Sequence, residues 1–181
     1  MTDVDSRRAF RDLLGSMPAG VCVITTDGPA GRAGMTASSV CSLSLQPLLL
    51  LVCIGNGSGT LHAIRRNNRF AVNLLHEAHE RTAGVFATDR PAEEKFADTD
   101  HHLVDGSPVL RHALGWLTCR VHSTVPGGDH TIVLGEVLDL SRADGQSLVW
   151  HHGRYGYHRT AHHALPETSL PLDTAHTMDR P

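Results

Sequence analysis

The chain has 181 residues, about the length of one domain, and its 40% hydrophobic and 19% charged residues are typical of a globular protein. Its formal net charge of −3 provides no basic excess for binding nucleic-acid phosphates. The longest apolar run, Leu48 to Ile54, has seven residues and is too short to span a membrane, so no membrane partner is expected. The first residues are rich in charge and lack an apolar signal core, so we expect a cytoplasmic protein.

Short helices are predicted at three places along the chain. Residues 6–15 carry an apolar stripe at helical spacing. Residues 61–67 predict a second helix, which Ser58 or Thr60 can cap. Residues 77–97 are also expected to be helical, with an interruption at a proline.

Strands are predicted where apolar, often β-branched residues form runs bounded by turn residues. The run 48–54 is interpreted as a central strand, because it is continuously apolar. The other expected strands are 20–26, 32–39, 70–75, 114–125, 130–140 and 148–151. Because the strands do not alternate regularly with helices, we predict a mainly β (α+β) fold, an antiparallel barrel capped by short helices. The polar tail from Thr160 is expected to be a frayed end or an arm that reaches a partner chain.

Fourteen histidines raise the question of a metal site, but their spacing argues against one. His76 and His79 are three residues apart and do not form the HExxH pattern of zinc proteases. The cysteines have no CxxC spacing either, so we expect no metal and four reduced structural thiols. These thiols belong to Cys22, Cys41, Cys53 and Cys119.

Four segments carry residues suited to ligand binding, and each also has an ordinary structural interpretation. Residues 34–39 could hold an anion or the polar edge of a flat ring, or could simply suit a strand. Residues 55–60 are a glycine-rich turn before a helix, either a phosphate site or a flexible loop. Residues 127–130 either place His130 at the mouth of a barrel or form a capped turn. Residues 152–156 either present an Arg-Tyr pair to a substrate or form a terminal turn.

In their order and spacing these segments resemble the flavin reductase family with the FMN-binding split-barrel fold, the small reductase partners of two-component flavin monooxygenases. The similar stretches run from Pro18 to Gly156 and are PAGVCVITT, AGMTASSVCSLSLQPLLLLVCI, SGTLHAIRRNNRFAVNLL, EEKFAD, GGDHTIVLGEVLDL and LVWHHGRYG. The resemblance implies a homodimeric, antiparallel Greek-key split β-barrel with flavin near the subunit interface. The barrel domain would occupy residues 1–159, and residues 160–181 would form a C-terminal tail.

The resemblance also implies roles for single residues. His130 would face the nicotinamide and orient it, without moving a proton. Many relatives have a basic residue where this chain has Asn56, and Arg65 or Arg66 could compensate in binding phosphate. The residues expected at the flavin are Gly34, Met35, Thr36, Ser38, Ser39, Ile54, Gly55, Asn56, Ser58, Thr60, Leu61, Lys95 and Phe96, with the phosphate end near Ser58 and Thr60. Those expected near the dinucleotide are His152, Gly153, Arg154 and Tyr155.

The implied reaction is hydride transfer from NADH or NADPH to FMN or FAD, after which the reduced flavin passes to a separate monooxygenase. The cofactors carry the chemistry, and the protein supplies orientation and electrostatics. Two other interpretations stay open. An oxidase or oxygenase with this fold would retain its flavin through gel filtration, and a flavin-binding electron carrier would be inert to NADH.

Overall fold

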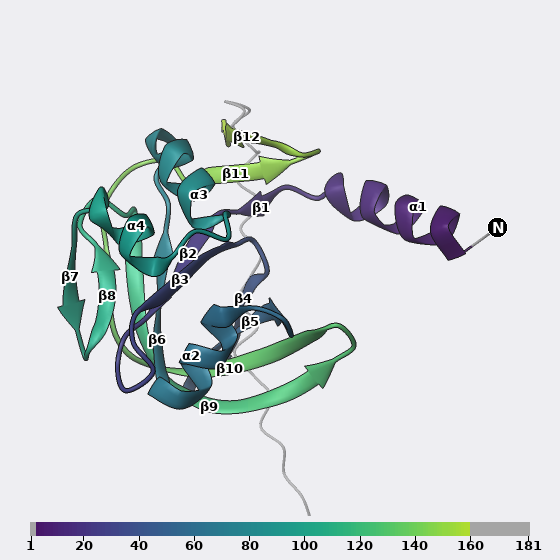
Figure 1. The fold of residues 1–181 in the computed structure, drawn as a ribbon. Helices are drawn as coiled ribbons and strands as arrows, with labels where there is room; N and C mark the ends of the chain where they lie inside the picture. Colours follow the sequence, from purple (N-terminus) through teal and green to yellow (C-terminus); the bar gives the residue numbers. More distant parts are fainter. Residues whose placement is uncertain (1–2, 160–181) are drawn as a thin grey trace, which may run out of the picture.

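The computed structural model describes residues 3–159, so the tail predicted at 160–181 lies outside the described residues. Seven antiparallel strands form the main sheet, which curls around the core and ends at β3 and β4 without closing (Figure 1). This architecture confirms the predicted mainly β split barrel. In spatial order the strands are β3 (Ala33–Ala37), β2 (Cys22–Thr26), β6 (Arg69–Leu74), β9 (Gly115–Gly127), β10 (His130–Arg142), β5 (Leu48–Gly55) and β4 (Val40–Leu45).

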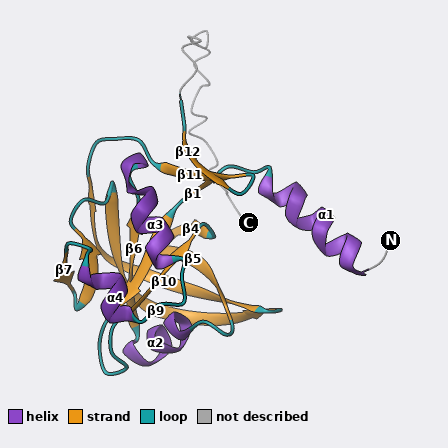
Figure 2. Cartoon of the chain, turned by 45° about the horizontal axis from the view of Figure 1, so that its top comes forward, coloured by secondary structure: helices purple, strands orange, loops and turns teal. Residues whose placement is uncertain are grey.

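Two smaller sheets and a few short helices complete the described part of the chain (Figure 2). The first small sheet has the order β1 (Ala19–Gly20), β11 (Leu148–His151) and β12 (Arg154–Tyr157), and the second is the hairpin of β7 (His101–Val104) and β8 (Ser107–Leu110). The α-helices are α1 (Asp3–Gly15), α2 (Gly59–Asn67), α3 (Glu80–Phe86) and α4 (Ala92–Ala97), and a 3-10 turn at Glu77–His79 precedes α3. None of the helices within residues 3–159 is long and apolar enough to cross a membrane.

The strand β2 lies between two hydrophobic clusters, which is why all five of its residues are buried. Successive side chains of a strand point to opposite faces. Ile24 therefore packs with Leu61 of α2 in the first cluster, whereas Val23 packs with Phe86 of α3 in the second. These two clusters fix α2 and α3 on opposite sides of β2 and β3, and the functional site described below lies between them.

Several expected elements are confirmed, and one interpretation was wrong. The helix predicted at 61–67 is α2, and the proline interruption in 77–97 is the loop between α3 and α4. The strand predicted at 48–54 exists as β5, but it is not central, because only the edge strand β4 lies beyond it. Its residues alternate between buried and partly exposed positions, so one face of this apolar strand is only partly covered by the rest of the molecule.

Four strands were not predicted from the sequence, and three of them belong to hairpins with two-residue turns. The hairpins β7–β8 and β11–β12 turn at Asp105–Gly106 and His152–Gly153, where both residues of each pair have positive φ. Two-residue turns of this kind join tightly paired strands of only four residues, which are too short to show clear periodicity. The fourth missed strand, β4, has mixed polar and apolar residues at the edge of the sheet.

Candidate functional site

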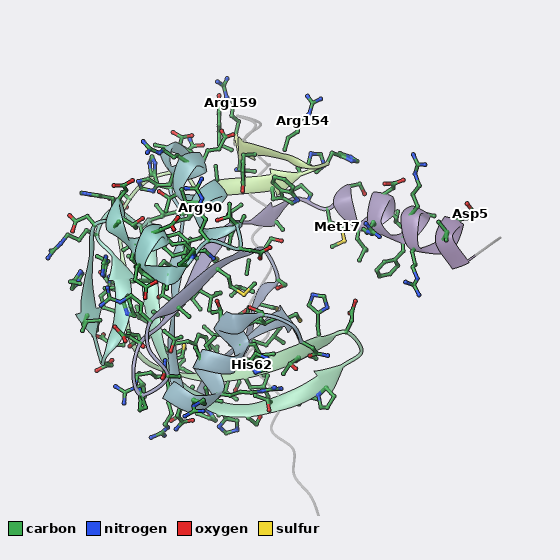
Figure 3. All side chains as sticks on the ribbon, viewed as in Figure 1. Asp5, Met17, His62, Arg90, Arg154 and Arg159 are labelled. Atoms are coloured by element: carbon green, nitrogen blue, oxygen red, sulfur yellow. The ribbon has the colours of Figure 1, made fainter. Side chains whose placement is uncertain are left out.

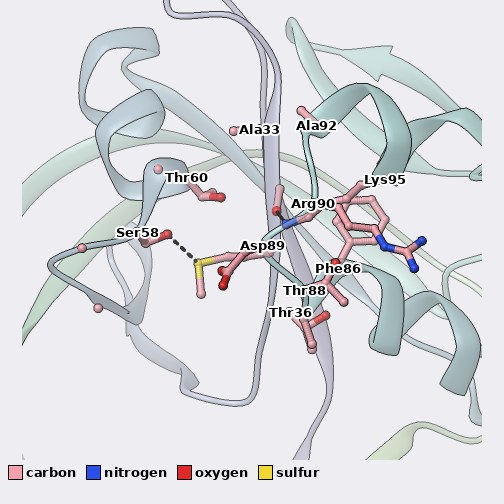
Figure 4. A pocket seen from close by; sticks show the side chains of 16 residues that line it. Ala33, Thr36, Ser58, Thr60, Phe86, Thr88, Asp89, Arg90, Ala92 and Lys95 are labelled. Carbon is pink, nitrogen blue, oxygen red and sulfur yellow. Dashed lines mark hydrogen bonds between the residues drawn. The ribbon is translucent and has the colours of Figure 1, made fainter.

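A cavity of about 600 Å³ opens between β3, the loop that follows β5, and the segment from the end of α3 to α4 (Figure 4). Its first wall comes from residues 33–36, and its second from the glycine-rich turn and the first two residues of α2. Its third wall comes from residues 86–90 together with Ala92 and Lys95. The cavity thus brings together segments that are about sixty residues apart in the sequence.

In the first wall, Gly34 provides close contact between β3 and α3. A Cβ atom at this position would lie 2.7 Å from Cε1 of Phe86, so only glycine leaves room for that ring. The hydroxyl of Thr36 donates a hydrogen bond to the carbonyl of Ala83 at 2.6 Å, which ties the strand to the same helix. The Sδ of Met35 accepts a hydrogen bond from the Ser58 hydroxyl at 3.4 Å and so links the first wall to the second.

In the second wall, the N-terminus of α2 lines the cavity. Ser58 is the N-cap residue, but no side chain caps the helix, and its first turn holds no acidic residue. The first N–H groups of a helix lack partners within the helix, and the helix dipole makes this end positive. Ser58, Gly59 and Thr60 therefore form a site with the properties that a phosphate group requires.

In the third wall, Lys95 is the only lysine of the chain and is 8% exposed. Its Nζ donates a hydrogen bond to the carbonyl of Gly34 at 3.2 Å. Burial lowers the pKa of this amino group, and the nearby Asp89 carboxylate partly offsets the effect by raising it. The neighbouring Phe96 does not line the cavity: it packs edge-on against Phe86 in the core, with ring centroids 5.0 Å apart.

His130 does not line this cavity itself, but it lies next to the second wall and is held by its neighbour. The register of β10 and β5 pairs His130 with Gly55, which is part of the second wall, and a Cβ at Gly55 would lie 4.0 Å from the His130 Nε2. The Nδ1 atom is 2.8 Å from the Asp129 carboxylate, and the side chain is 50% exposed. The hydrogen bond with His130 lowers the pKa of Asp129. Nδ1 of His130 is thus directed at Asp129, whereas Nε2 lies beside Gly55 of the second wall.

The structure brings together only part of the predicted site. The predicted residues that line the cavity are Gly34, Met35, Thr36, Gly55, Ser58, Thr60 and Lys95. Ile54 and Leu61 are fully buried in the core beside it, and the Ser39 hydroxyl bonds the carbonyl of Cys53 at 2.8 Å. Ser38 is an exposed residue in the turn between β3 and β4, and Asn56 lies in the turn after β5.

The residues predicted near the dinucleotide lie on a different sheet. His152 and Gly153 form the turn between β11 and β12, and Arg154 points outward from that hairpin (Figure 3). The ring of Tyr155 packs edge-on against Trp150, with centroids 4.8 Å apart. Within one chain, none of these four residues lines the cavity.

The loop that connects α3 to α4 is the part of the site that the sequence analysis missed. Thr88, Asp89 and Arg90 line the cavity, and they immediately precede Pro91. The sequence analysis used this segment only as a helix break, although an acidic and a basic residue before a proline also suggested an exposed polar loop. Arg90 is thus the arginine of the cavity lining, whereas the Nη2 of Arg65 is hydrogen-bonded to Thr131 at 3.1 Å outside it.

No metal centre is present in the part of the chain that the structure describes, since residues 3–159 contain no group of three or more His, Cys, Asp or Glu side chains able to hold a metal ion. All four cysteines are free. The chemistry that the cavity offers therefore comes from hydroxyl groups, backbone N–H groups, one buried lysine and the charged side chains of Asp89 and Arg90.

The fold and the cavity define a split-barrel protein whose cavity is lined by the N-terminus of a helix, and comparison with known proteins identifies its family. Residues 14–159 match the family model described as the flavin reductase like domain. The chain belongs to the flavin reductase like family.

Named relatives and solved structures agree with this assignment. The chain is 40% identical over 154 residues to the FMN reductase (NADH) RutF of Cronobacter sakazakii, which covers 84% of this chain and 93% of the relative. It superposes with a TM-score of 0.82 and 34% identity on a homolog of nitrilotriacetate monooxygenase component B from Mycobacterium thermoresistibile, covering 87% of this chain and 89% of that one. The NADH:FAD oxidoreductase SgcE6 of Streptomyces globisporus, solved with NAD and FAD fragments, matches with a TM-score of 0.81 and 34% identity over 91% of this chain and 98% of its own.

Proposed function

We propose that this protein is an NADH-dependent flavin reductase that acts on FMN or FAD. The observation that carries the proposal is the uncapped N-terminus of α2, which opens into the cavity that His130 borders. The names of the relatives support the same activity. In the overall reaction NADH loses a hydride and becomes NAD⁺, while the flavin gains this hydride and a proton from solvent.

The residues of the cavity suit a flavin, with its phosphate at Ser58, Gly59 and Thr60. Bound flavin would supply the ring atom that accepts the hydride. The close packing at Gly34 keeps the first wall flat enough for a planar ring, and Lys95 provides positive charge on that side. The remaining residues carried over from the family, including Phe96 and the 152–155 turn, stay predictions.

We assign to His130 the role of binding and orienting the nicotinamide. The Nδ1 of this histidine is held by Asp129 and its Nε2 lies beside Gly55, and we assign to Nε2 a hydrogen bond with the carboxamide of the nicotinamide. Holding two reactants in contact removes much of the entropic part of the barrier. His130 thus orients the hydride donor, and no proton transfer by the protein is required.

The reduced flavin would leave for a separate monooxygenase, as the name of the component B relative suggests. The walls of the cavity consist largely of glycines and short hydroxyl side chains, which offer few apolar contacts to retain a flavin. We place the reaction in the cytoplasm, where thiols stay reduced, in keeping with the four free cysteines.

We further propose that the protein is a homodimer. The helix α1 extends away from the barrel (Figures 1 and 3), and the Phe10 and Leu13 side chains on it are 63% and 68% exposed. Leu45 and Leu48, at the β4–β5 turn, are also exposed. An apolar stripe of this kind is stable in water when a partner covers it, and a second copy offers the matching apolar edge of the sheet.

Steady-state kinetics with every combination of NADH, NADPH, FMN and FAD tests the proposed activity. We expect flavin-dependent oxidation of NADH, with free flavin behaving as a substrate. His130→Ala should raise the KM for NADH by roughly tenfold, the value of one lost hydrogen bond to a polar ligand. The matched control is His122→Ala, on the exposed part of β9. Absence of oxidation with either nucleotide would exclude a reductase, and flavin retained through gel filtration would favour an oxidase or an electron carrier.

A further inference from the structure

A continuous chain of hydrogen bonds connects α2, the glycine-rich turn and the turn between β9 and β10. The Nη2 of Arg65 donates to the Thr131 hydroxyl at 3.1 Å, and that hydroxyl donates to the side-chain oxygen of Asn56 at 2.7 Å. The side-chain nitrogen of Asn56 in turn donates to the carbonyl of Gly128 at 3.0 Å. The backbone N–H of Asn56 also donates to the carbonyl of Asp129 at 3.0 Å.

This series of hydrogen bonds begins where the pairing of β5 with β10 ends. The ladder between β5 and β10 stops at the pair of Gly55 and His130, and Asn56 is the next residue. The amide of Asn56 therefore continues the connection between two turns that no longer share a sheet ladder. Thr131, at the centre of the chain of bonds, is 4% exposed, and bonds shielded from water hold their partners more strongly than exposed ones.

Each of the connected turns carries one half of the proposed site. The turn after β5 supplies Gly55 and Ser58 to the cavity wall, and the β9–β10 turn supplies His130. A change in the distance between these turns would move the histidine relative to a ligand in the cavity. Misplacement of reacting groups by even a fraction of an ångström is costly to a bimolecular reaction.

We propose that Asn56 and Thr131 are positioning residues that hold His130 at a fixed place beside the flavin cavity. This inference rests on the proposed function. It also gives a chemical reason for an asparagine at this position. An amide both accepts from Thr131 and donates to Gly128, whereas a lysine or arginine side chain can only donate.

The test compares Thr131→Val with Thr131→Ser. Valine keeps the β-branched shape and removes the hydroxyl, whereas serine keeps the hydroxyl, so the serine variant serves as the conservative control. In the flavin-free protein, hydrogen exchange measured by mass spectrometry should become faster in residues 55–57 and 127–130 of the valine variant and stay unchanged in the serine variant. Asn56→Ala, at an exposed turn, should give the same result without altering the core.

The kinetic readout separates positioning from a general loss of structure. For Thr131→Val we expect the KM for NADH to rise about five- to tenfold while the Kd for flavin stays within about twofold, since the two hydrogen bonds of the Thr131 hydroxyl are lost away from the phosphate site. Unchanged exchange in both turns, or equal losses in flavin and NADH binding, would overturn the inference. If the wild-type protein does not oxidise NADH, the proposed function fails, and the exchange experiment still decides whether the two turns are coupled.

Discussion

Gly34 shows how a single residue shapes the cavity. A Cβ at this position would lie 2.7 Å from the Phe86 ring, which is 1% exposed and would have to shift. Gly34→Ala should therefore lower the free energy of unfolding by about 1–3 kcal/mol, the usual cost of overpacking. The control is Gly57→Ala, where a Cβ meets nothing within 4 Å. Urea denaturation of both variants measures this difference, and equal stability of the two would contradict the packing argument.

The cysteines differ in reactivity because they differ in burial. Burial raises the pKa of the Cys22 and Cys119 thiols to about 12, so neither forms the reactive thiolate at neutral pH. Cys41 is exposed on β4. Brief treatment of the folded protein with iodoacetamide, followed by mass spectrometry, should show modification of Cys41 and none of Cys22 or Cys119. Rapid modification of either buried thiol would mean that β2 or β9 opens.

Lys95 predicts a pH dependence of stability at alkaline pH. Its folded pKa is lowered by burial, so between this value and its ordinary pKa the unfolded chain binds more protons than the folded one. The free energy of unfolding should therefore rise with pH through this window. Lys95→Met should remove this contribution. Urea denaturation of the flavin-free proteins over this pH range measures how steeply the free energy of unfolding rises with pH. An equal rise in wild type and variant would show that Lys95 is not its source.

At the scale of elements, the N-terminus of α2 predicts a preference for phosphorylated flavin. FMN carries a phosphate that riboflavin lacks, and hydrogen bonds to a charged group are worth about 1.5–3 kcal/mol. We expect FMN to bind at least about tenfold more tightly than riboflavin, with the difference decreasing as salt is added. Titration of the protein with each flavin, followed by protein fluorescence, measures the two dissociation constants. Equal affinities would place the phosphate away from Ser58, Gly59 and Thr60.

Helices, strands and turns differ in how far the local sequence predicts them. The helix α2 could be predicted because its apolar residues recur at helical spacing, and Leu61, Ala63 and Ile64 are buried. The position of β5 in the sheet could not be predicted, because an apolar run shows burial but not which strands pair beside it. The Asp-Gly pair at 105–106 was a readable turn signal, and it would have indicated the β7–β8 hairpin.

The candidate site could be predicted only where its residues form a continuous motif. The 34–36 and 55–60 segments met at the cavity as the resemblance implied, and Lys95 joined them. Phe96 follows Lys95 directly in the sequence, yet it packs into the core, because adjacent residues of a helix lie on different faces. The contribution of residues 88–90 depends on how α3 and α4 dock, which is a tertiary property.

At the scale of the whole molecule, the exposed face of α1 predicts a dimer. Sedimentation should give twice the mass of one chain for the wild type. Leu13→Asp combined with Phe10→Asp places charge in the apolar stripe and should produce monomers, because a buried unpaired charge is costly. The control is Arg8→Asp, on the opposite face of the helix. A monomeric wild type, or a dimer that survives the double substitution, would argue against the role of α1.

The central claim is that NADH reduces flavin on this protein, and anaerobic mixing tests it most directly. The protein, an equal amount of FMN and an excess of NADH are mixed without oxygen, and the yellow flavin absorbance is followed with and without protein. We expect rapid bleaching of FMN that depends on the protein and is matched by the loss of one NADH for each flavin. Bleaching no faster than in the absence of protein would contradict it.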